Sequence, residues 1–116
     1  MTTTLGHIQT EQRGEVIIAT LLDRKIIDPG LMQELGDELF KLVDEHRSLI
    51  IDFGNIQFFF TTMLSKLIIL DKKLKSHGCK LRLCNMREEI YEVFALTRLN
   101  QLFDIKGSLD QAIEGL

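Results

Sequence analysis

A chain of 116 residues, of which 45% are hydrophobic, is the size of one ordinary domain and can build a single core. Its formal net charge of -3 gives no broad positive field, which argues against nucleic acid or an anionic membrane as a primary partner. No apolar run approaches the roughly 20 residues that span a bilayer, and the first residues lack the pattern of a signal peptide. We therefore expect one cytoplasmic domain over residues 1–116.

The beginning of the chain predicts a β-hairpin. Residues 7–12 have a mixed pattern, Arg13-Gly14 offers turn chemistry, and residues 16–21 are largely apolar. After an exposed connection, Asp28-Pro29 predicts the start of a helix, because the carboxylate can accept from unpaired amides and Pro is favourable at the first helical position. An apolar stripe predicts that this helix runs to about Glu45.

The centre of the chain predicts a buried strand followed by an amphipathic helix. Leu49, Ile50 and Ile51 form an unbroken apolar run, and residues 52–55 supply a turn. Apolar residues then recur at helical spacing from residue 63 to residue 74, with lysines on the opposite side. The helix should start near Thr61 or Thr62, where the first amides are unpaired, and should end at Gly78.

The last third of the chain predicts two more strands and two more helices. Residues 80–84 alternate as a strand, and Asn85 is expected to cap a helix with Glu88 three places on. Residues 102–105 indicate a short strand, and Ser108 with Gln111 indicates a final capped helix. Strands separated by helices pair in parallel, and the opening hairpin adds an antiparallel strand to the same sheet. The predicted fold class is therefore α/β, with a mixed sheet and about four helices.

Candidates for catalysis or metal binding are few. His7, His46 and His77 fall at predicted element ends, where histidines usually lie on the surface. Cys79 and Cys84 are expected to be buried free thiols, since their odd spacing in one strand would point them to opposite faces. The sequence holds no phosphate-binding glycine loop, zinc motif or nucleophile elbow. We expect no enzyme, no catalytic residue, no metal site and no cofactor.

The string from Leu49 to Phe58, followed by two hydroxyl residues that open a helix, resembles the signature of the STAS domain of bacterial anti-sigma factor antagonists. The typical form is a strand, Asp-Leu-x-x-Val-x-Phe-x-Asp-Ser-Ser-Gly-Leu, and a helix. Residues 96–112 are similar to the closing segment of the family. Phe60 stands where the family usually has Asp, Thr61 and Thr62 replace the two Ser, and Met63 replaces the Gly. The resemblance implies a STAS-like fold.

The resemblance also implies a function. Such a protein would bind an anti-sigma factor of the histidine-kinase-like ATPase type, release the sigma factor and be turned off by phosphorylation. Thr62 aligns with the modified Ser of the family and is the first candidate phosphoacceptor, with Thr61 second. The structural alternative is that a Thr only caps the helix. Lys25 occupies the position of a family Gly and Asp28 ends a family Leu-Asp pair, which makes both candidate partner contacts.

The three consecutive phenylalanines cannot all face one core from an extended segment. We expect Phe58 to point inward, Phe59 to be partly covered, and Phe60 to be exposed. With Met63, Phe60 would then form an apolar patch beside the two hydroxyls and contact a partner or a second copy of the chain. The alternative is that Phe60 joins the core.

Two further functions stay open. One is a scaffold-type STAS protein that assembles with other STAS subunits without an on-off cycle, as the missing Asp and Gly suggest. The other is a module that binds a small ligand in its loops, for which the sequence offers no specific residue.

Overall fold

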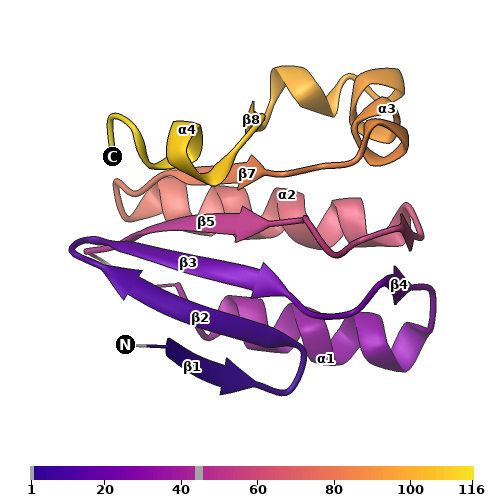
Figure 1. The fold of residues 1–116 in the computed structure, drawn as a ribbon, viewed down its shortest axis with the longest axis horizontal. Coiled ribbons are helices and arrows are strands. Elements are labelled where there is room, and N and C mark those ends of the chain that lie inside the picture. The colour runs from indigo at the N-terminus through magenta and orange to yellow at the C-terminus, as the bar shows by residue number, and fades with distance from the viewer. Residues whose placement is uncertain (1, 44–45) are drawn as a thin grey trace.

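The computed structural model describes residues 2–43 and 46–116 (Figure 1). In chain order, the elements within these residues are β1 (Thr2–Leu5), β2 (Ile8–Arg13), β3 (Val16–Leu21), β4 (Lys25–Ile26), α1 (Pro29–Phe40), β5 (Ser48–Asp52), β6 (Phe58–Phe59), α2 (Thr62–Ser76), β7 (Leu81–Cys84), α3 (Glu88–Leu96), a 3-10 helix η1 (Leu99–Gln101), β8 (Asp104–Lys106) and α4 (Leu109–Ile113).

The main sheet has six strands in the order β1-β2-β3-β5-β7-β8. β1, β2 and β3 pair antiparallel, and the remaining neighbours pair parallel, so the predicted mixed sheet is confirmed. The predicted turn near Gly14 is also confirmed, and this residue has a φ of 60°. β1 was missed, because its exposed threonines carry no alternation of apolar and polar residues.

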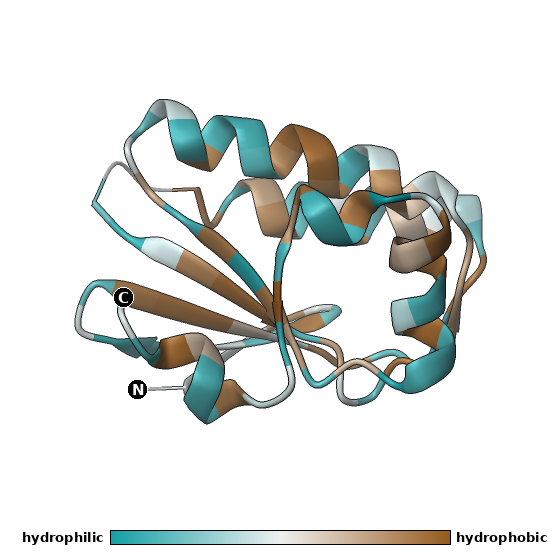
Figure 2. Ribbon diagram, turned by 90° about the horizontal axis from the view of Figure 1, so that it is seen from above, coloured by the Kyte–Doolittle hydropathy of each residue, from teal (hydrophilic) through white to brown (hydrophobic). Residues whose placement is uncertain are grey.

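Helices cover both faces of the main sheet. α1 and α2 lie on one face and α4 lies on the other (Figure 2), and buried apolar residues of these helices pack in the clusters against the sheet. Because both faces of β5 are covered, its sequence is apolar without interruption. Leu49 and Ile51 pack in the large core under α1 and α2, while Ile50 packs on the other face in a small cluster with Ala112 of α4.

A cluster of aromatic rings packs α3 against β6, against the loop after β5 and against the residue before β8. The ring of Phe94, which is fully buried, lies 6.2 Å from Phe53 and 5.8 Å from Phe103 in edge-on contacts. It also lies 6.1 Å from the ring of Phe59. Edge-on rings at these separations attract each other beyond the area they bury. The cluster therefore holds β6, and with it the approach to α2, in place.

Two boundary predictions were wrong. α1 ends at Phe40 and not near Glu45, a residue outside the described part of the chain. Leu42 and Val43, which extended the predicted stripe, pack against the core from a turn that follows the helix. Asn85 does not cap α3, which begins after Arg87. With a φ of 60°, it donates from Nδ2 to Asp52 Oδ2 at 3.1 Å and so joins the ends of β5 and β7.

Other local predictions are confirmed. Asp28 Oδ2 accepts from the amide of Leu31 at 3.0 Å at the start of α1. Ser108 Oγ accepts from the amide of Gln111 at 3.2 Å at the start of α4. Cys79 and Cys84 are both buried, and no disulfide joins them. Burial, aided by the charge of Asp52, raises the pKa of Cys84 to about 12, so this thiol stays protonated and unreactive.

Candidate functional site

A small two-stranded ladder brings two distant segments together at the start of α2. β4 pairs parallel with β6, with Lys25 opposite Phe58 and Ile26 opposite Phe59. The amide of Phe60 extends the ladder by donating to the carbonyl of Ile26 at 3.0 Å. β4 and the starts of α1 and α2 lie at the same end of the molecule, toward which the parallel strands point (Figure 1). This ladder was not predicted, because each strand is only two residues long.

The ladder decides which phenylalanines face the core. Phe59 is 7% exposed and belongs to the core, as does its neighbour Ile26. Phe58 and Phe60 point to the opposite side, with 52% and 45% of their surface exposed. The expectation that Phe58 points inward was wrong, whereas the predicted exposure of Phe60 is confirmed. The rings of Phe58 and Phe60 lie 6.1 Å apart, edge to face, and form an exposed aromatic pair.

Thr61 and Thr62 follow this pair directly, and both are exposed. Thr61 is the residue before the first turn of α2, and no side chain caps the helix there. The interpretation of these threonines as caps is therefore wrong. Their hydroxyls lie at a helix start whose first turn carries no acidic residue to balance the positive end of the helix dipole.

Met63 is not part of the exposed patch. It is 3% exposed and packs in the core under α2, so the expectation of an apolar surface formed with Phe60 was wrong for this residue. At the second position of α2, its side chain falls on the inner face of the helix. Ile27, which is 40% exposed and follows β4, was missed as a surface residue. Its alternation with the buried Ile26 was the available signal.

Lys25 and Asp28 both lie near this end of the fold. Lys25 is exposed on β4, opposite Phe58 in the ladder. Asp28 is exposed as well, and one of its oxygens already caps α1. The predicted contact of either residue with a partner stays a prediction.

The loop between β5 and β6 is fixed by side chains of the Asp-Phe-Gly-Asn string. Asp52 Oδ1 accepts from the amide of Gly54 at 2.8 Å, which closes a tight turn. Asn55 Nδ2 donates to the carbonyl of Leu21 at 2.9 Å and ties the loop to the end of β3. These contacts fix the loop that leads into β6 and α2. The residues of the sequence motif thereby help to position Thr61 and Thr62.

We name the exposed residues around this point the α2 entry surface and define it as Lys25, Ile27, Phe58, Phe60, Thr61 and Thr62. Its chemistry is that of a contact surface, with apolar side chains beside two hydroxyls. Among the described residues, no group of three or more His, Cys, Asp or Glu could hold a metal ion. Surface hollows lie elsewhere: one is lined by Asp71 and Leu102, one by Tyr91 and Lys106, and one by Thr3 and Leu42.

The sequence matches the STAS domain family over residues 7–112. The chain belongs to the STAS domain family. This match and the described fold confirm the resemblance found in the sequence, including the strand, loop and helix that carry the signature. The STAS domain accounts for the mixed sheet and its four helices. No helix of the described residues is long and apolar enough to cross a membrane.

Solved structures of anti-sigma factor antagonists are similar to this STAS domain. An anti-sigma factor antagonist domain protein from Planctomyces limnophilus is 14% identical, with a TM-score of 0.81, over 90% of this chain and 93% of the other. An anti-sigma factor antagonist from Mycobacterium paratuberculosis is 22% identical, with a TM-score of 0.79, over 97% and 92%. The Bacillus cell fate determinant SpoIIAA in its phosphorylated form is 14% identical, with a TM-score of 0.67, over 92% and 96%. At these identities the likeness establishes the fold. No curated protein matches the sequence.

Proposed function

We propose that this STAS domain is a cytoplasmic anti-sigma factor antagonist that binds an anti-sigma factor of the histidine-kinase-like ATPase type through the α2 entry surface. Phosphorylation of Thr62 by that kinase would end the binding, with Thr61 as the second candidate acceptor. The chain itself would supply no catalysis and no cofactor, since the ATP belongs to the kinase. The whole chain, residues 1–116, would act as one domain.

The observation that carries the proposal is the pair of exposed hydroxyls at an uncapped helix start. Thr61 stands at the start of α2 without a side-chain capping hydrogen bond, and Thr61 and Thr62 are both exposed, so both hydroxyls are accessible to a kinase. A phosphate on Thr62 would add about -1.5 to -2 charges beside the positive end of α2, which the helix tolerates. The fold would therefore survive phosphorylation while the surface changed its charge and shape.

The aromatic pair supplies the apolar part of the contact. Phe58 and Phe60 are exposed side by side and directly precede the two threonines in the chain. A buried aromatic anchor contributes about 2 kcal/mol or more at the centre of an interface. A phosphate next to such an anchor would have to be desolvated on docking, which opposes binding. The same surface can therefore bind in one state and be repelled in the other.

The test incubates this protein with ATP and an anti-sigma factor of the histidine-kinase-like ATPase type from the same organism, and reads phosphorylation by intact mass and peptide mapping. We expect one phosphate, which Thr62→Ala abolishes. Ser65→Ala is the matched control, because Ser65 is an exposed hydroxyl on the next turn of the same helix.

Two results would contradict the assignment. A phosphate that persists in Thr62→Ala and disappears in Thr61→Ala would move the acceptor by one residue. No phosphate at all, with binding to other STAS proteins or to a second copy, would favour the scaffold function, for which the exposed Phe60 in place of the family Asp is the supporting observation. A small-ligand module has no such support, since the hollows named above include no residue of the α2 entry surface.

A further inference from the structure

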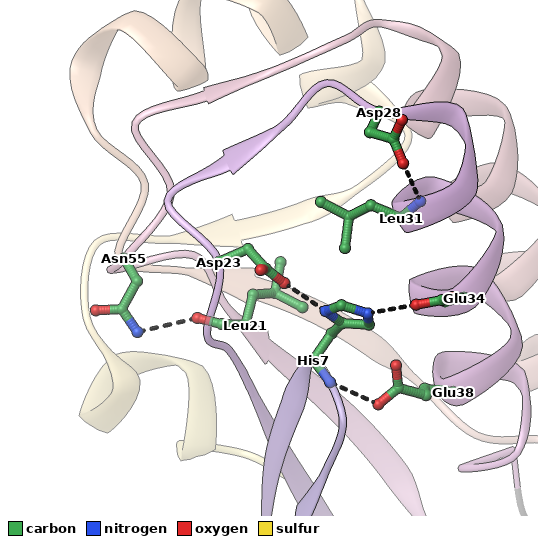
Figure 3. A network of polar contacts seen from close by, with 8 residues as sticks. All are labelled: His7, Leu21, Asp23, Asp28, Leu31, Glu34, Glu38 and Asn55. Atoms are coloured by element: carbon green, nitrogen blue, oxygen red, sulfur yellow. Dashed lines mark hydrogen bonds and ion pairs between the residues drawn. The ribbon is translucent and has the colours of Figure 1, made fainter.

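A cluster of carboxylates surrounds His7 at the tip of the β1–β2 hairpin (Figure 3). Nδ1 of its ring lies 2.9 Å from Oδ2 of Asp23, which follows β3. Nε2 lies 2.8 Å from Oε2 of Glu34 on α1. The backbone amide of His7 donates to Oε1 of Glu38, one turn further along α1, at 2.8 Å. One residue thus contacts three carboxylates from two separate parts of the chain.

The contacts of the two ring nitrogens favour the protonated form of His7. A neutral imidazole has one N–H donor and one acceptor nitrogen, whereas an imidazolium has two donors. Here each ring nitrogen lies within hydrogen-bond distance of a carboxylate oxygen. An ionised carboxylate can accept hydrogen bonds but cannot donate them. Both contacts are favourable at once only if the ring carries both protons. A neutral ring would leave one nitrogen lone pair facing a carboxylate.

We propose that His7 is a proton-operated latch that holds the tip of the β1–β2 hairpin against α1 and against the start of the β3–β4 connection. The contacts span 16, 27 and 31 residues of sequence, so they join segments that the local chain does not hold together. The amide of Leu22 also donates to the carbonyl of His7 at 3.0 Å, which couples the latch to the backbone of that connection.

The charged groups that act on the ring all have the same sign. Glu34 raises the pKa of His7 above its ordinary value most strongly through its hydrogen bond, and Asp23 and Glu38 raise it further, while partial burial opposes them. A raised pKa in the folded state means that the latch is fully closed below the ordinary histidine value of about 6.5. The latch opens as the pH rises through the pKa of the folded state.

Opening of the latch would release the start of the β3–β4 connection, which leads to part of the α2 entry surface. Asp23 lies two residues before Lys25, which begins β4. The latch inference does not depend on the proposed partner, since it concerns contacts within this chain alone. Its readout is the protection of individual amides and the titration of one ring.

The test follows the ring of His7 by NMR as a function of pH, together with hydrogen-exchange protection factors of the His7 and Leu22 amides. We expect a titration midpoint above about 6.5 and a several-fold loss of both protection factors across that same midpoint. Glu34→Gln should lower the midpoint, because it removes the charge and keeps an acceptor oxygen. Glu92→Gln, which changes an exposed carboxylate on α3, should leave it unchanged.

The latch would be overturned by a His7 midpoint at or below about 6.5, or by protection factors that stay constant across the titration. A His7→Gln variant gives a second reading. Its stability should fall short of the wild type most at low pH, and the difference should shrink as the pH rises through the His7 midpoint. If this variant does not fold, the Glu34→Gln titration decides by itself.

Discussion

At the scale of the residue, the exposure of each phenylalanine depends on which side of the two-residue strand β6 its side chain occupies. Phe59 is buried against Phe94, while Phe58 and Phe60 form an aromatic pair on the surface. A shift of one residue in the pairing with β4 would exchange these roles. Adjacent residues of one type therefore differ in role: Phe59 packs in the core, and Phe58 and Phe60 are exposed and available for the proposed contact.

This difference predicts contrasting effects of two substitutions. Phe60→Asp removes one ring of an exposed pair and should lower the free energy of unfolding by about 1 kcal/mol. Phe59→Ala leaves a cavity in the core and should lower it by about 3 to 5 kcal/mol. Urea denaturation measures both values, and titration of the partner kinase should show weaker binding for Phe60→Asp. A Phe60→Asp variant as unstable as Phe59→Ala would contradict the exposed position of this ring.

At the scale of the element, the two ends of α2 differ in how side-chain charges balance the helix dipole. Its first turn carries no acidic residue, whereas Lys73 and Lys75 lie in the last turn, where cations are favourable. Lys75 also pairs with the buried Asp71 at 2.9 Å within the helix. The charge distribution thus leaves the start of α2 as the place where an added anion stabilises the helix.

A charge at position 62 should therefore stabilise the fold and weaken docking. Thr62→Glu is expected to raise the free energy of unfolding by roughly 0.3 to 1 kcal/mol relative to Thr62→Gln, which has the same shape without the charge. The difference should decrease at high salt. Denaturation at two salt concentrations measures it, and binding of the kinase is compared for the two variants. A large loss of stability in Thr62→Glu alone would show that this position cannot hold a phosphate.

At the scale of the whole molecule, Arg82 connects the sheet to the last helix. Its side chain is largely buried on β7, and Nη1 donates to the carbonyl of Ala112 at 2.9 Å and to the carbonyl of Glu114. Nε lies 2.8 Å from Oδ2 of Asp104, an ion-pair contact without hydrogen-bond alignment. α4 has only five residues, so these contacts and the burial of Ala112 hold it on the sheet.

Loss of this arginine should destabilise the packing of α4 more than it destabilises the rest of the fold. Arg82→Met keeps the apolar stem but leaves the Ala112 carbonyl without its donor, which should cost about 1 to 3 kcal/mol. Hydrogen exchange should show the amides of α4 losing protection first. Lys106→Met is the control, because it removes a more exposed cation from the same Asp104 and should cost at most about 1 kcal/mol. Equal effects of the two variants would contradict a special role of Arg82.

The sequence by itself determined the features that arise from neighbouring residues. The apolar run of β5 is continuous, and the helical spacing of α2 repeats over several turns. The caps at Asp28 and Ser108 bond within three residues along the chain. Such signals are local and therefore legible in one sequence. The same holds for the strand, loop and hydroxyl pair, which by themselves indicate the STAS family.

Only the tertiary structure decided which side chains reach the surface and which groups meet. The inward turn of Phe59, the burial of Met63 and the failure of Thr61 to cap α2 all follow from how β6 and the start of α2 pack on the rest of the chain. The carboxylates around His7 likewise come from positions 16 to 31 residues away. These contacts depend on pairings between distant segments, and a single sequence does not record those pairings, because each segment alone is compatible with several of them.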